Sequence, residues 1–195
     1  MTAPKVFKGS LIGAAGLFAV AASLYAAPGI AGPTGAALAL IMLAVAVIDL
    51  RLLMIPDELN ALAAALGLCA VAYEQWQDMP GPALEALLRG AVTGAFFFTF
   101  RFVYRRIRGR EGIGLGDVKL AAVAGIWLDW TSLPISVEIA AVAALGFVAA
   151  RGIGYRRAPD PLAKLPFGTF FAPAIWLAWL IEAVGERLWV RIFGV

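Results

Sequence analysis

Two aspartates stand where long apolar runs of the sequence end or begin, and carboxylates in such places are candidates for chemistry. Asp49 ends the run 34–50, and Asp117 opens the run 117–130. Two carboxyl groups that share one partly dehydrated site cannot both ionise easily, so one keeps a proton while the other is charged. The charged carboxylate can take a proton from a water that attacks a peptide carbonyl, while the protonated one donates to the carbonyl oxygen.

The composition removes most other catalytic options. The 195 residues include no histidine and one cysteine, Cys69, which lies inside an apolar run. Without histidine there is no Ser-His or Cys-His catalysis and no zinc site that needs imidazole. A lone cysteine forms no internal disulfide and no paired-cysteine metal site. We therefore expect no metal and no cofactor, and paired carboxylates need neither.

Three glycines precede the second aspartate. Gly112, Gly114 and Gly116 alternate with other residues directly before Asp117. Glycine allows close approach of the backbone to another element and adopts conformations closed to other residues. These glycines either form a hinge that lets Asp117 move toward Asp49, or permit close packing of this segment against the second apolar run.

Other residues near the two motifs have both structural and functional interpretations. Pro56 stops any helix from continuing past the first motif, and Asp57 is placed to cap the next helix. Lys119 either stabilises a nearby aspartate charge or holds a substrate carbonyl or lipid phosphate; alternatively, it is an interfacial lysine that extends to the headgroups. A later segment either breaks the chain before the last apolar run or forms a wall of a substrate groove: Pro166, Phe167 and Gly168.

The aspartates themselves also have a purely structural interpretation. Asp117 can serve as an N-cap. Asp49 can be a carboxylate at the level of the lipid headgroups, neutralised by Arg51 or by the arginines in 105–110. Glu85 and Arg89 are four residues apart and are expected to pair along one helix.

The bulk composition dictates where these residues must be placed. The chain is 62% hydrophobic with a mean hydropathy of +0.87. That excess cannot all be buried in a core of this size, so most of it must face lipid. We predict an all-α, polytopic membrane protein with one domain over residues 1–195. About seven transmembrane helices are expected, at 11–27, 34–50, 58–73, 83–104, 117–130, 133–150 and 167–184.

The basic residues predict the orientation. If the N-terminus is cytoplasmic and seven spans alternate, thirteen lysines and arginines fall on the cytoplasmic side and two, Arg187 and Arg191, on the other. Cytoplasmic loops are enriched in such residues. The same orientation places Asp49 and Asp117 together at the cytoplasmic face.

Four short motifs carry a family resemblance. They are Gly-Leu-Gly-Asp-Val-Lys-Leu at 114–120, Asp49 followed after six residues by Pro-Asp, Gly-Arg-Glu at 109–111, and Lys-Leu-Pro-Phe-Gly at 164–168. With them the chain resembles the bacterial type IV prepilin peptidases, a family of membrane aspartyl proteases, over most of Ala44–Pro173. The resemblance implies that Asp49 and Asp117 are the catalytic pair.

The resemblance also implies the setting. The substrates would be prepilins or pseudopilins, whose basic leader is cut on the cytoplasmic side of the bacterial inner membrane, in a pilus or type II secretion system. Membrane lipids are the other expected partners, and no nucleic acid is expected. Arg51 and Thr169 stand where family members often have an acid and a proline.

One departure concerns a second activity. Large members of the family carry a domain with paired cysteine motifs between their first two spans and also methylate the new N-terminus. Here about seven residues join the first two runs, so we expect the short, peptidase-only form. Two other functions stay open on the residues alone: a small transporter whose carboxylates relay protons, and a non-catalytic scaffold of a pilus or secretion machine.

Overall fold

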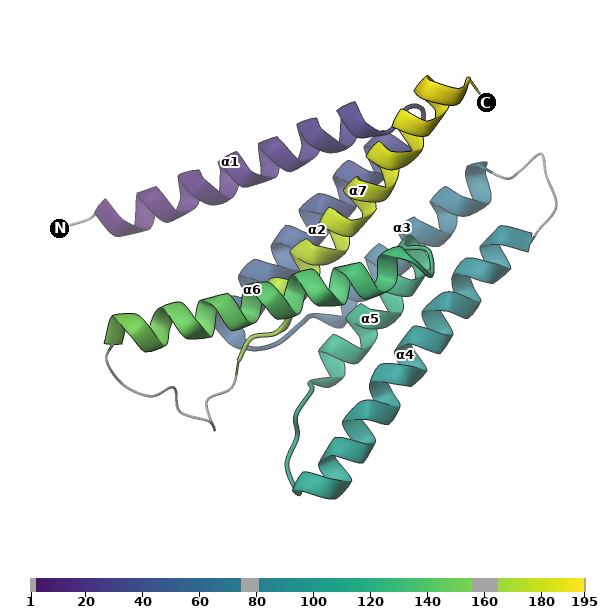
Figure 1. Ribbon diagram of the computed structural model, residues 1–195. Helices are drawn as coiled ribbons and strands as arrows, with labels where there is room; N and C mark the ends of the chain where they lie inside the picture. The colour runs from purple at the N-terminus through teal and green to yellow at the C-terminus, as the bar shows by residue number, and fades with distance from the viewer. Residues whose placement is uncertain (1–2, 75–80, 156–164, 195) are drawn as a thin grey trace.

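The computed structural model describes residues 3–74, 81–155 and 165–194, and every regular element in these ranges is an α-helix (Figure 1). The helices are α1 (Ala3–Ala26), α2 (Ala31–Leu52), α3 (Asp57–Glu74), α4 (Gly81–Arg108), α5 (Leu115–Trp127), α6 (Ser132–Tyr155) and α7 (Gly168–Phe193). The predicted all-α class is confirmed, and each helix overlaps one expected apolar run. Arg156, Arg157 and Lys164, which enter the predicted charge asymmetry, lie outside the described residues.

Five of these helices, α1, α2, α4, α6 and α7, are long and apolar enough to cross a membrane. The chain is therefore a polytopic membrane protein. The other two helices differ from them: α3 contains Asp57, Glu58 and Glu74, and α5 has 13 residues. At 1.5 Å per residue α5 is about 20 Å long, which is shorter than a hydrocarbon core of about 30 Å.

The helices are arranged around α2 and α7, which lie side by side (Figure 1). On one side α5 packs against α3, α4 and α7, while α1 packs against α2 and α6 against α7. The core between these helices contains fully buried side chains of α2, α5 and α7: Leu38, Met42, Leu120, Phe171 and Ile175. Large apolar side chains are also exposed on the outer helix faces, as expected for contact with lipid, among them Leu17, Phe96 and Val142.

Small residues bring α4 and α5 into close contact. A Cβ at Gly125 would lie 2.6 Å from the Arg89 carbonyl oxygen, and one at Gly90 would lie 2.9 Å from the Ala122 carbonyl oxygen. Arg89 then bridges the two helices, because its Nε donates to Gly125 O at 3.3 Å while its Nη1 pairs with Glu85 at 2.8 Å. The predicted Glu85–Arg89 pair is confirmed.

Candidate active site

Asp49 lies in the last turn of α2, and its carboxylate contacts the start of α7. The residue is 5% exposed. Its Oδ2 accepts a hydrogen bond from the backbone N–H of Thr169 at 2.7 Å and another from Thr169 Oγ1 at 3.2 Å. The helix ends just beyond, because Leu53 adopts a left-handed conformation with φ 54° and donates its N–H to Asp49 O at 2.9 Å. Hydrogen bonds to a carboxylate favour its charged form.

A single isoleucine, Ile55, fills the space between the starts of α5 and α7. A Cβ at Gly168 would lie 2.7 Å from Ile55 Cδ1 and 3.0 Å from Asp49 Oδ2. A Cβ at Gly116 would lie 2.9 Å from Ile55 Cβ. Both glycines therefore contact the same side chain, one beside Asp49 and the other beside Asp117. Their lack of a side chain is what allows the two motifs to approach each other.

Asp117 is the third residue of α5 and is half-buried. Its Oδ2 accepts a hydrogen bond from the backbone N–H of Gly114 at 3.2 Å, and its carboxyl interacts electrostatically with that of Asp49. One structural interpretation made Asp117 the N-cap of this helix. That interpretation is wrong, because Gly114 occupies the N-cap position. Both aspartates that the sequence singled out therefore lie near Ile55, Asp49 beside Gly168 and Asp117 directly after Gly116.

The glycines before Asp117 are required for space. No described glycine with positive φ belongs to this segment, and Gly114 has an extended backbone with φ −70° and ψ 153°. The expectation of conformations closed to other residues is therefore wrong here. Instead, a Cβ at Gly112 would lie 2.6 Å from Tyr104 Cδ1, and Gly116 contacts Ile55 in the connection after α2.

Comparison with known proteins identifies the family of this chain. Residues 36–149, more than half of the chain and including both aspartates, match the type IV leader peptidase family. The chain belongs to this family. It is 40% identical over 149 residues to the prepilin leader peptidase/N-methyltransferase of Burkholderia pseudomallei (strain 1026b). It is 34% identical over 143 residues to a protein of the same name from Dichelobacter nodosus.

These matches include most of this chain but less than half of each relative. They cover 72% and 73% of this chain but 45% and 46% of the two relatives. The chain therefore spans about half the length of the curated relatives it matches. No solved structure matches it significantly.

In this leader peptidase family member, Lys119 pairs with Asp57. The distance from Lys119 Nζ to Asp57 Oδ2 is 2.6 Å. Asp57 is the first residue of α3, so Pro56 precedes the helix, and no cap hydrogen bond from the Asp57 side chain occurs within the described residues. The expected cap is thus replaced by an ion pair that joins the starts of α3 and α5. Lys119 does pair with an aspartate, as one interpretation held, but this aspartate is Asp57 and not a member of the candidate catalytic pair.

An arginine that the sequence analysis counted only as a topology residue orders the segment before α5. Arg101 Nη2 pairs with Glu111 Oε1 at 2.7 Å, and Arg101 Nη1 donates to the carbonyl oxygen of Ile113. Arg105 lies 3.7 Å from the same glutamate. None of the ion pairs among the described residues involves Asp49, so the alternative interpretation, in which nearby arginines neutralise it, is not observed.

The Pro-Phe-Gly segment forms the start of α7 beside Asp49. Phe167 is the N-cap residue, and its ring packs against Phe171 with centroids 5.4 Å apart. Pro166 O also accepts a hydrogen bond from the N–H of Thr169 at 3.2 Å. The segment therefore positions the donor to Asp49, and its contact with a substrate remains a prediction.

Ile55 of the site and the buried Asn60 of α3 both escaped the sequence analysis. Ile55 looked like any apolar residue before a proline. Asn60, on the first turns of α3, is 4% exposed, and neither of its side-chain polar atoms has a hydrogen-bond partner in the described structure. A lone amide in an apolar run was the available signal. Within the described residues no group of three His, Cys, Asp or Glu side chains is arranged to hold a metal ion.

Proposed function

We propose that this protein is an aspartyl endopeptidase that cuts the basic leader from type IV prepilins or pseudopilins. The observation that carries the proposal is that two helix ends distant in sequence converge on Ile55, the end of α2 with Asp49 and the start of α5 with Asp117. Membership of the leader peptidase family and the names of its relatives support the substrate class.

The two carboxylates divide the work of hydrolysis. Asp49, with its two donors from Thr169, is the charged member and takes a proton from the attacking water. Asp117, with one backbone donor, is the protonated member and gives its proton to the carbonyl oxygen as the tetrahedral intermediate forms. Collapse of the intermediate breaks the C–N bond: the leaving nitrogen receives a proton from the Asp49 carboxyl group, and a hydroxyl of the intermediate returns its proton to Asp117, which restores both carboxyl groups to their starting states.

The orientation is part of the proposal. The asymmetry of basic residues supports a cytoplasmic N-terminus, with both aspartates at the cytoplasmic face of the bacterial inner membrane. A prepilin presents its basic leader and scissile bond on that side. Prepilin and membrane lipids are the proposed partners, and no role for nucleic acid or a cofactor is proposed.

The test is cleavage by the purified chain in lipid nanodiscs. The substrate is a synthetic prepilin segment with a basic leader, a Gly-Phe junction and an apolar helix, and mass spectrometry identifies the products. We expect a cut between Gly and Phe that survives a metal chelator and alkylation of Cys69. We also expect no methylation when S-adenosylmethionine is added. Intact substrate together with proton flux across vesicles would favour the transporter, and intact substrate without flux would favour the scaffold.

A further inference from the structure

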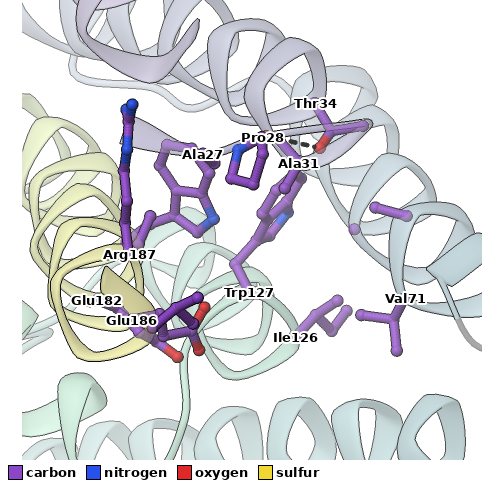
Figure 2. Close-up of a pocket in the computed structure, with 15 residues that line it drawn as sticks. Ala27, Pro28, Ala31, Thr34, Val71, Ile126, Trp127, Glu182, Glu186 and Arg187 are labelled. Atoms are coloured by element: carbon purple, nitrogen blue, oxygen red, sulfur yellow. Dashed lines mark hydrogen bonds between the residues drawn. The ribbon is translucent and has the colours of Figure 1, made fainter. Parts of the chain in front are cut away.

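A cavity with charged residues lies away from the two aspartates (Figure 2). It has a volume of about 420 Å³ and opens between α2, α3, α5 and α7, next to the turn that joins α1 and α2. Its charged lining residues all come from α7: Glu182, Glu186 and Arg187. Neither Asp49 nor Asp117 lines it, so the cavity is separate from the candidate active site.

The cavity lies at the opposite membrane boundary. Ala31 lines the cavity at the first residue of α2, and Asp49 lies 18 positions later (49 − 31) on the same helix. At 1.5 Å per residue this separation is about 27 Å, close to the thickness of a hydrocarbon core of about 30 Å. One end of α2 therefore holds the catalytic candidate, and the other end lies at the level of lipid headgroups.

Glu182 lines this cavity, and one of its carboxylate oxygens lacks a donor, while the carboxyl group also interacts with Ser132 and with the backbone of Asp129. Glu182 Oε2 is buried and has no hydrogen-bond partner in the described structure. A buried acceptor without a donor is destabilising, and more so when it is charged. Figure 2 shows the carboxylates of Glu182 and Glu186 close together, with the Arg187 side chain extending toward another part of the cavity. The guanidinium of Arg187 lies 4.6 Å from the ring centre of Tyr25.

Two fixed indole rings form part of the wall. The Nε1 of Trp127 donates to Ala63 O at 2.9 Å. The ring of Trp179 occupies the space above Gly35, where a Cβ would lie 1.8 Å from a ring carbon. Both tryptophans line the cavity. Aromatic faces attract organic cations, and tryptophan is the strongest of them.

We propose that this cavity binds the headgroup of phosphatidylethanolamine, with the ammonium group at Glu182 and the phosphate toward Arg187. An ammonium group supplies the N–H donor that Glu182 Oε2 requires, whereas the quaternary amine of phosphatidylcholine has no N–H. The separation of the carboxylates from the guanidinium suits a zwitterion. A lipid is the source because the cavity lies where headgroups lie, and free phosphoethanolamine is the alternative source of the same chemistry.

The test is lipid retention by the full chain, measured by native mass spectrometry after extraction from mixed vesicles. We expect one retained phosphatidylethanolamine and at least tenfold less retained phosphatidylcholine or phosphatidylglycerol. Glu182→Gln and Arg187→Gln should each reduce this retention at least tenfold. Glu138→Gln is the matched control, because Glu138 is an exposed glutamate of α6 that does not line the cavity. It should retain the lipid as the parent chain does.

Three results would overturn the proposal. Equal retention of the ethanolamine and choline lipids would mean that no N–H donor is recognised. Unchanged retention in Glu182→Gln, with the melting temperature of the parent chain, would remove the carboxylate from the site. Saturable binding of free phosphoethanolamine without retention of the lipid would assign the cavity to a soluble amine. Asp117→Asn should retain the lipid fully, so this test is independent of the proposed peptidase activity.

Discussion

The backbone N–H of Thr169 donates to Asp49 Oδ2 at 2.7 Å and so joins the first turn of α7 to the last turn of α2. The Thr169 hydroxyl lies 3.2 Å from the same oxygen and 3.3 Å from Ala46 O, so its proton has two acceptors. Asp117 receives one backbone donor, from Gly114 at 3.2 Å. The two carboxylates are therefore held differently, which is the basis of their different proposed roles.

Replacing Thr169 by valine removes the hydroxyl and keeps the shape and the backbone donor. A hydrogen bond to a charged group is worth about 1.5–3 kcal/mol, and 1.4 kcal/mol corresponds to tenfold in rate. We expect kcat to fall about tenfold with KM changed less than twofold, and Thr169→Ser to restore most of the rate. Equal kcat values for the valine and serine variants would show that the hydroxyl does not position Asp49.

Methyl groups added at the two glycines around Ile55 should separate the motifs. Gly168→Ala places its methyl 2.7 Å from Ile55 Cδ1, and Gly116→Ala places its methyl 2.9 Å from Ile55 Cβ. Overpacking of this kind costs about 1–3 kcal/mol. We expect both variants to melt at lower temperature and to lose activity.

Ile55→Val separates the effects of Gly168→Ala and Gly116→Ala, because it deletes Cδ1 and keeps Cβ. It should partly rescue the stability of Gly168→Ala and leave Gly116→Ala unrescued. Rescue of both variants to the same extent would refute the contacts described here. If Gly116→Ala instead lowers turnover at unchanged stability, the hinge interpretation of this segment is favoured over packing.

The ion pair between Lys119 and Asp57 should contribute little to stability. Both side chains are largely exposed, at 48% and 67%, and exposed pairs are worth about 0–1 kcal/mol. We expect Lys119→Met and Asp57→Asn each to keep more than a third of the parent kcat/KM. A loss in Asp57→Asn as large as that in Asp49→Asn would show that the first motif has been assigned incorrectly.

The stability that Asp129 contributes, in the connection before α6, should decrease in acid. Burial alone would raise the pKa of Asp129, but hydrogen bonds from Ser132 and Thr131 outweigh it, and the net pKa lies below the ordinary value. A depressed folded-state pKa gives stability that is present above the unfolded pKa of about 4 and is lost as the pH falls below it. We expect Asp129→Asn to melt at a lower temperature than the parent chain at pH 7. This difference in melting temperature should be smaller at pH 3. A constant difference across this range would contradict the assignment.

The helices followed from the sequence, and so did the choice of Asp49 and Asp117 as candidates, whereas the contacts around these aspartates did not. Apolar runs of the right length predict helices, and Asp49 and Asp117 stood out because carboxylates are costly beside lipid. The partner of Lys119 depends on how α3 and α5 start relative to each other, which no local pattern specifies. Thr169 donates to Asp49 through both its backbone N–H and its hydroxyl, and Ile55 acts through its position between two glycines. Both roles depend on how distant segments meet, which no local pattern specifies.

The most direct measurement is the cleavage rate of the prepilin segment by Asp49→Asn, Asp117→Asn and the double variant, each checked for an unchanged melting profile. If the two carboxylates activate one water together, each single change should lower kcat/KM by about 10²–10⁴-fold, and the double change should be no worse than the more severe single change. Retention of more than a tenth of the parent activity by either single variant, or losses that multiply in the double variant, would contradict the shared two-aspartate mechanism.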